Sequence, residues 1–144
     1  LLDKDFGVTA DIWSCPSFTE LARDGEDAIR TNRLNPEGEQ RKPYVTTLLE
    51  GRQGPAIAAT DYVRTFANQI REFVPMKYTV LGTDGFGRSD TRANLRRHFE
   101  VDRYYIAHAA IAALAAEGKM TAKDVARAIK QYKLDGEKPN PLGV

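Results

Sequence analysis

The stretch Gly82-Thr-Asp-Gly-Phe-Gly-Arg-Ser89 follows a short apolar segment, residues 78–81, and precedes a segment with helical character, residues 90–99. A strand, a glycine-rich turn and a helix in this order are typical of α/β proteins, in which amides at the start of the helix can face a ligand. The glycine spacing fits neither G-x-G-x-x-G nor the phosphate-binding P-loop. The stretch therefore indicates a fold class, and a structurally required strand-to-helix turn is its simplest interpretation.

Strands and helices are predicted to alternate on both sides of this turn. Apolar residues recur at helical spacing in several segments, and Ser17 with Glu20 and Thr121 with Asp124 have the spacing of capping boxes. Further expected helix ends are an N-cap at Thr60 or Asp61, an N-cap at Asp102 and a C-terminal glycine at Gly118. Segment 44–49 fits either a strand or a short helix. This alternation predicts an α/β fold with a largely parallel sheet covered by helices. The expected strands are 10–14, 55–60 and 78–81, and the expected helices are 18–29, 61–74, 90–99, 103–117 and 121–132, with Tyr132, Val125 and Ile129 facing inward on the last.

Two stretches are predicted to be irregular within a single domain that covers residues 1–144. Residues 31–43 are polar and contain two prolines and a glycine, which predicts a surface loop, and residues 134–144 predict an extended tail. The first seven residues have the pattern of the last turns of a helix that ends at Gly7. We therefore expect the chain to be a fragment of a longer one.

Composition limits the function classes. The 144 residues are 42% hydrophobic, and 21 basic and 20 acidic side chains give a net charge of +1, so we expect neither nucleic acid nor a membrane as a partner. No apolar run approaches the roughly 20 residues that a membrane span needs. The single cysteine, Cys15, excludes an internal disulfide and a CxxC metal pair. These features predict a reducing, cytoplasmic setting.

Four arginines lie within ten residues, at the end of the turn and after it: Arg88, Arg92, Arg96 and Arg97. On a continuous helix, Arg88, Arg92 and Arg96 would share one face and could bind phosphate or nucleic acid. Acidic neighbours favour a salt-bridged interface or a solvated face instead.

No set of side chains predicts catalysis by this chain alone. His98 and His108 lack the spacing of a metal-ligand pair, and Cys15 has no nearby histidine to activate it. Three aspartates flank expected strand ends, where turns and helix caps are favoured over metal or catalytic roles: Asp11, Asp61 and Asp84. We expect no catalytic, cofactor-binding or metal-binding residue here.

Two adjoining runs, 81–90 and 92–102, resemble the C-terminal region of the homodimeric, bacterial-type pyruvate dehydrogenase first component, a thiamin-diphosphate-dependent, transketolase-like family. Residues 17–25, 59–62 and 138–141 agree with it, so the resemblance covers essentially the whole chain. A shorter Gly-x-Asp-x-Phe-Gly-x-Ser pattern is similar to transketolases, which share the fold of this C-terminal domain.

The resemblance implies a three-layer α/β/α domain with a mixed, mostly parallel sheet, whose first strand and helix would lie before Leu1. It implies a homodimer that oxidatively decarboxylates pyruvate and passes the acetyl group to lipoyl-lysine of an acetyltransferase. Thiamin diphosphate and magnesium would be held by upstream domains, so the resemblance implies an inactive fragment without a cofactor. The residues that belong to the family's turn, and that are candidates for an interface, are Gly82, Asp84, Gly85, Phe86, Gly87, Arg88, Ser89 and Arg92.

Three functions follow as hypotheses. The first is a structural and assembly domain of that enzyme, with the Ala-rich helix 103–117 and the arginine face in subunit contacts. The second is a free-standing module that binds a phosphate or another small anion at residues 82–89. The third is a contact of loop 31–43 with the acetyltransferase.

Overall fold

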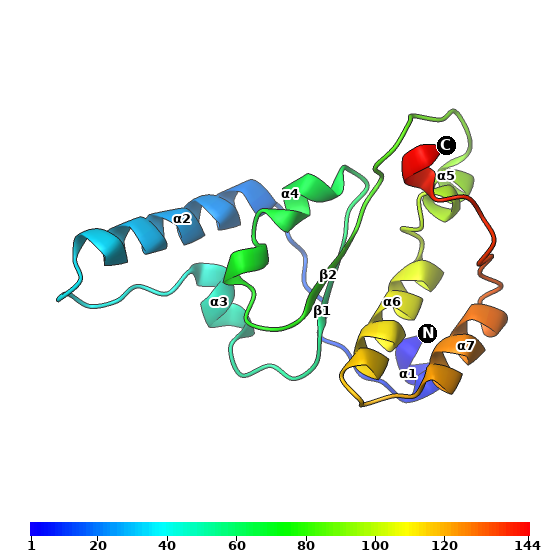
Figure 1. Cartoon of the computed structure of the whole chain (residues 1–144), viewed down its shortest axis with the longest axis horizontal. Coiled ribbons are helices and arrows are strands. Elements are labelled where there is room, and N and C mark those ends of the chain that lie inside the picture. The colour runs from blue at the N-terminus through cyan, green and yellow to red at the C-terminus, as the bar shows by residue number, and fades with distance from the viewer.

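Two parallel strands, β1 (Ala56–Ala59) and β2 (Tyr78–Leu81), lie at the centre of the computed structural model, which describes residues 1–144 (Figure 1). Ala56 lies opposite Tyr78 and Ala59 opposite Leu81. Both strands are rich in β-branched or small apolar residues, which suit a sheet that is covered on its faces. The helices are α1 (Leu2–Phe6), α2 (Phe18–Leu34), α3 (Tyr44–Leu49), α4 (Arg64–Asn68), α5 (Arg92–His98), α6 (Arg103–Ala116) and α7 (Ala122–Gln131), with 3₁₀ turns η1 (Arg71–Phe73) and η2 (Pro141–Gly143).

Helices lie on both sides of the strands, which confirms the α/β class. In Figure 1, α2, α3 and α4 lie to one side of β1 and β2, and α1, α6 and α7 lie to the other. Helix α6 contacts both strands, and α4 contacts β2. The sheet itself has two strands and both are parallel, so it is smaller than the mixed sheet that the resemblance implies.

The apolar core is divided between these two sides. One cluster joins α2, α3 and the segment after α4 to the strands, and includes Val45, Ile70, Phe73 and Val80. The other joins α6 to α7 and α1, and consists of Ala107, Ile111, Ala128 and Tyr132. The sheet and its turn are thus held between two packed groups of helices.

Helix α2 shows how close this packing is. A Cβ built on Gly25 would lie 2.6 Å from Cζ of Phe73, a ring that is 4% exposed. Because an aromatic ring fills the space where a side chain would be, Gly25 permits the approach of α2 to η1.

Several predicted local signals are confirmed. Gly7 ends α1 with φ 65°, and Gly118 follows α6 with φ 73°. Thr121 and Asp124 form the complete capping box of α7, and Asp102 accepts hydrogen bonds from the first amides of α6. Segment 44–49 is a helix, which resolves the ambiguity left by its sequence.

The strand predicted at residues 10–14 is wrong. These residues are exposed and irregular, and Ile12 is 90% exposed. No backbone hydrogen bond joins them to β1 or β2. A strand needs a neighbour to satisfy its amides, and this segment has none within the chain.

The helix predicted over residues 61–74 is interrupted. Helix α4 ends at Asn68 and the 3₁₀ turn η1 follows at Arg71. Val63 occupies the N-cap position without a side-chain hydrogen bond, so the prediction that Thr60 or Asp61 caps the helix is wrong.

Two boundaries and two contacts also differ from the predictions. Helix α2 continues to Leu34, where the amide of Asn35 donates to the carbonyl of Thr31, so the irregular stretch is 35–43 rather than 31–43. Residues 134–144 are irregular rather than simply extended, with a turn at 136–138 before η2. Ile129 is 37% exposed, while Ala128 is the buried residue of α7. Glu20 pairs with Arg23 rather than with the cap backbone.

No helix has both the length and the apolar character that crossing a bilayer requires.

Candidate functional site

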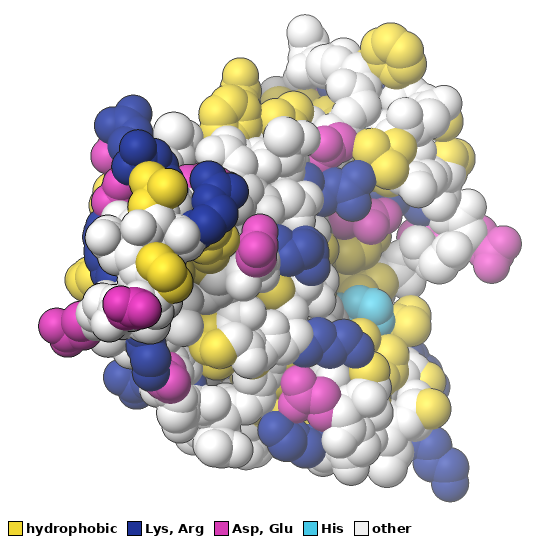
Figure 2. Space-filling model, turned by 60° about the vertical axis from the view of Figure 1, so that its left-hand side comes forward, with side chains coloured by type: hydrophobic (Ala, Val, Ile, Leu, Met, Phe, Trp, Pro, Cys, Tyr) yellow, Lys and Arg dark blue, Asp and Glu magenta, His cyan; other side chains and the backbone are white.

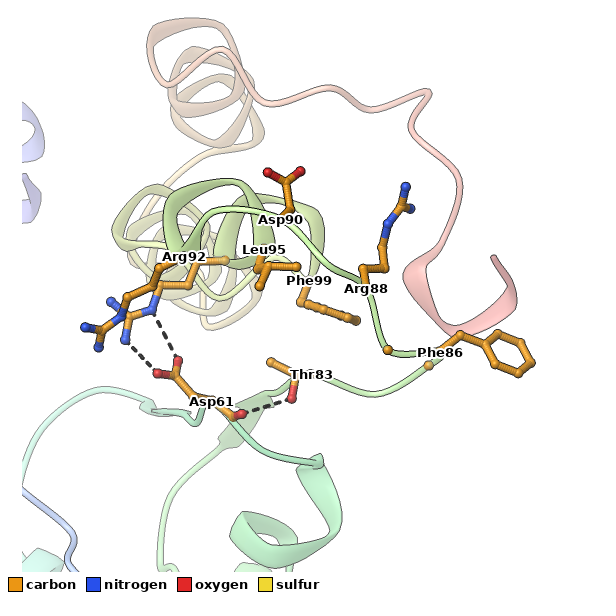
Figure 3. A pocket seen from close by; sticks show the side chains of 11 residues that line it. Asp61, Thr83, Phe86, Arg88, Asp90, Arg92, Leu95 and Phe99 are labelled. Atoms are coloured by element: carbon orange, nitrogen blue, oxygen red, sulfur yellow. Dashed lines mark hydrogen bonds and ion pairs between the residues drawn. The ribbon is translucent and has the colours of Figure 1, made fainter.

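The glycine-rich turn connects β2 to α5 through an irregular segment, residues 82–91. Helix α5 begins only at Arg92, because the Thr91 hydroxyl caps it by accepting from the amide of Asn94 at 3.3 Å. Arg88 therefore precedes the helix, and the predicted helical row of Arg88, Arg92 and Arg96 is wrong. Figure 3 shows Arg88 directed away from Arg92.

The start of the turn is fixed to the segment before α4. A Cβ on Gly82 would lie 2.7 Å from the carbonyl oxygen of Tyr62. The amide of Thr83 donates to that same oxygen at 2.9 Å, and the Thr83 hydroxyl donates to the carbonyl of Asp61 at 3.1 Å. Gly82 thus permits a close approach between two backbone segments that are distant in sequence.

Asp84 joins the turn to α4. Its carboxylate accepts from the amide of Arg64 at 3.1 Å and pairs with Nε of the same residue at 2.8 Å. The amide is one of those at the helix start that lack a partner within the helix. Asp84 therefore supplies the cap of α4 from outside it, which is a structural role.

The middle of the turn supports the C-terminal tail. Gly85 has φ 110°, and a Cβ there would overlap the carbonyl oxygen of Pro141, a buried residue of the tail. The remaining turn residues point outward: Phe86 is 73% exposed, and Gly87 and Ser89 are exposed. A Cβ on Gly87 would meet no atom within 4 Å.

A cavity of about 500 Å³ lies between this turn, α5 and the segment at Asp61 (Figure 3). Basic, acidic and apolar side chains line it. They are Arg88, Arg92 and Arg96; Asp61 and Asp90; and Phe86, Leu95 and Phe99, together with Thr83, Gly85 and Gly87.

The charges around the cavity are unevenly paired. Arg96 pairs with Asp61 at 2.7 Å, and this hydrogen bond and charge raise the pKa of the guanidinium. Asp90 accepts from the side chain of Asn94 at 2.8 Å and from the next amide, and these bonds lower its pKa, so the carboxylate is ionised at neutral pH. Arg92 has no hydrogen bond or ion pair within the chain.

The two histidines do not form a common site. Nε2 of His98 and Nε2 of His108 are both buried without a hydrogen-bond partner. Burial lowers the pKa of each ring, and for His98 the guanidinium of Arg88, 3.4 Å from Nδ1, and the charge of Lys138 lower the pKa further. Both lowered pKa values favour the neutral rings at pH 7, and a role of the two histidines in packing stays a prediction.

The other polar candidates are in structural contacts. Asp11 pairs with Arg52 at 3.0 Å on the surface, so it is not at a strand end. Cys15 is half-buried, and burial raises the pKa of its thiol, which disfavours a nucleophile. No three His, Cys, Asp or Glu side chains come together in a way that could hold a metal ion.

Two long-range ion pairs that hold the site together are not predicted by any pattern in the sequence. The Arg96–Asp61 pair spans 35 residues. Lys138 of the tail reaches the last carbonyls of α5 and pairs with Glu100 at 3.1 Å. Both depend on the fold, because neither spacing corresponds to a motif.

The sequence of the chain matches one family model and several known proteins. Residues 1–102 match the family model described as the transketolase-like TK C-terminal domain. The chain is 59% identical over 144 residues to the pyruvate dehydrogenase E1 component of Cupriavidus necator, and the match covers 100% of this chain and 16% of that protein. The corresponding protein of Pseudomonas aeruginosa is 55% identical over 143 residues, with 99% and 16% covered.

The pyruvate dehydrogenase E1 component of Escherichia coli strain K12 is 51% identical over 142 residues, with 98% of this chain and 16% of that protein covered. The chain thus spans about one sixth of the length of these relatives. The predicted resemblance is confirmed, and this chain belongs to the transketolase-like TK C-terminal domain family.

Proposed function

We propose that the chain is the C-terminal structural and assembly domain of a pyruvate dehydrogenase E1 component. The observation that carries this proposal is a match over essentially the full chain, at 51% to 59% identity, to relatives of that name of which it spans only 16%. Such identity over a whole domain indicates the same place in the same kind of larger protein. The relatives give no support to the second hypothesis, a free-standing anion-binding module.

The larger enzyme, on this proposal, is a cytoplasmic homodimer that decarboxylates pyruvate oxidatively with thiamin diphosphate and magnesium. It passes the acetyl group to lipoyl-lysine of the acetyltransferase. The residues of this chain do not provide a set of metal ligands, so we assign no cofactor contact and no reaction step to them. Their proposed contribution is to hold the enzyme together.

Exposed aromatic and aliphatic side chains support an assembly role. Ile12 and Trp13 lie in the irregular segment before α2 and are 90% and 50% exposed. The rings of Tyr62 and Phe66 contact each other at an interplanar angle of 51°, with centroids 5.1 Å apart, yet remain 61% and 40% exposed. Large apolar side chains grouped at the surface mark contact sites, and we propose these two places as contacts within the dimer.

The rest of the surface is of mixed charge. Figure 2 shows basic and acidic side chains interspersed over the face that it displays. An interface that excludes charges from its centre would therefore be centred on the apolar groups rather than on the arginines.

Residues 35–43 remain a proposed contact for the acetyltransferase. Asn32 bonds with the backbone of Arg41 at 2.8 Å and 2.9 Å, and Arg41 pairs with Asp24 and Asp27. These bonds hold an exposed polar loop against α2, and a preorganised loop loses less entropy when it binds.

Turnover by the longer protein tests the proposed activity. With thiamin diphosphate, magnesium, pyruvate and a lipoyl acceptor, we expect acetyl transfer. Absence of transfer from pyruvate, with transfer from another 2-oxo acid, would refute the proposed substrate. Deletion of residues 35–43 should leave turnover with free lipoamide unchanged and weaken binding to the acetyltransferase, and unchanged binding would remove the loop from the proposal.

A further inference from the structure

The cavity between the turn and α5 has the volume of a binding site for a small molecule. Its volume of about 500 Å³ lies within the range of ligand pockets, roughly 300 to 1,000 Å³. None of the residues that line it has a role in the proposed assembly at Ile12, Trp13, Tyr62 and Phe66.

The charges favour an anion. Arg92 lines the cavity and no group of the chain neutralises it, whereas Arg96 is paired with Asp61. A guanidinium has five donors, so Arg96 retains donors for a further acceptor while it is paired. Asp90 is already engaged by Asn94 and by the next amide, and its charge limits the site to an anion of low charge.

The backbone beside the cavity has free donors. None of the amides of residues 86–90 donates a hydrogen bond within the chain, and all of these residues except Ser89 line the cavity. A carboxylate with two acceptor oxygens can use a guanidinium and neighbouring amides together.

The floor of the cavity is apolar. Figure 3 shows Leu95 and Phe99 of the α5 region directed into the space between the turn and Asp61. Phe86 lines the opening. A ligand that fills this space therefore needs an apolar body as well as a charge.

We infer that this cavity binds a small organic carboxylate, with its carboxylate at Arg92 and an apolar or aromatic body on Leu95 and Phe99. Binding here is separate from the turnover of pyruvate, since no residue of the cavity is assigned a reaction step.

Fluorine NMR on the intact, longer protein tests this site with 4-fluorobenzoate as the probe. We expect saturable binding that is weakened about tenfold or more by Arg92→Gln, because one charge-assisted bond is lost. Gly87→Trp should also abolish binding, since the new side chain has free space at its Cβ and lies at the cavity wall. The matched control is Arg30→Gln, which removes the same charge from an exposed, unpaired position on α2.

Five results would overturn the inference. Four concern binding: equal affinity in Arg92→Gln and Arg30→Gln, retention of binding by Gly87→Trp, equal binding of the neutral 4-fluorobenzyl alcohol, and equally effective displacement of the probe by inorganic phosphate. Loss of the dimer in Arg92→Gln would assign that residue to a subunit contact and would also overturn it. Acetyl transfer is measured on the same samples, so a failure of the proposed enzyme activity is seen separately from a failure of probe binding.

Discussion

Replacement of Gly85 by alanine is the perturbation for which the structure makes the sharpest prediction. Gly85 has φ 110°, a conformation that residues with a side chain rarely adopt. A Cβ there would overlap the carbonyl oxygen of Pro141 and lie 3.0 Å from its carbonyl carbon. Both are backbone atoms, so no side-chain rotation can remove the overlap.

Two costs add. A strained backbone conformation costs about 1–3 kcal/mol, and inserting an atom into a packed site costs about 1–3 kcal/mol. The chain can avoid the second cost by releasing the tail, which is held by buried Pro141 and by Lys138 on Glu100. A penalty of about 1.4 kcal/mol on the docked state shifts the equilibrium between the docked and the released tail tenfold toward release. Gly85→Ala is therefore expected to increase the released fraction of the tail by about tenfold or more.

Hydrogen exchange of the longer protein, followed by mass spectrometry, measures this release. Peptides that cover residues 82–91 and 134–144 should exchange faster in Gly85→Ala. Gly87→Ala is the matched control, because a Cβ at Gly87 meets no atom within 4 Å and its φ is not in the left-handed region. Equal exchange in the two variants would refute the proposed role of the turn as a support for the tail.

Three further changes test other parts of the structure. Gly25→Ala should lower the midpoint of thermal unfolding, although alanine favours a helix by about 1 kcal/mol, because the new Cβ meets the Phe73 ring; a raised midpoint would contradict this packing. Asp84→Asn should lower the free energy of unfolding in urea by about 1–3 kcal/mol, since the amide and Nε of Arg64 lose a charged acceptor; a decrease no larger than that of Asp11→Asn, which breaks the exposed pair with Arg52, would contradict this role of Asp84. Burial lowers the pKa of His108, so the native state binds fewer protons than the unfolded state as the pH falls below about 6.5. Stability should therefore decrease from pH 7 to pH 5, and less steeply in His108→Gln; an equal slope in both proteins would show that this ring does not contribute.

Local sequence signals were sufficient for helix ends that carry a side-chain cap or a terminal glycine at the expected position. The capping box at Thr121 and Asp124, the cap at Asp102 and the glycine at position 7 each depend on neighbours within four residues, and each is confirmed. The strands predicted at 55–60 and 78–81 are found at 56–59 and 78–81, because their residues suit a buried parallel pair.

Features that depend on distant partners were not predicted. Residues 10–14 have the composition of a strand, yet composition cannot supply the neighbouring strand that would satisfy their amides. The arginine row was missed for a local reason: Thr91 caps α5 through the amide of Asn94, so the helix begins later than predicted. The pairing of Asp61 with Arg96 leaves Arg92 without an acidic partner in the cavity, and neither this pair nor the pair of Asp84 with Arg64 has a sequence motif.

Sedimentation velocity of the longer protein, intact and without residues 1–144, tests the assembly role most directly. The account predicts a dimer for the intact protein and a monomer for the shortened one. It also predicts that Trp13→Glu, at an exposed apolar position, shifts the intact protein toward the monomer, whereas Arg30→Gln does not. A shortened protein that remains fully dimeric would contradict the proposal that this domain holds the enzyme together.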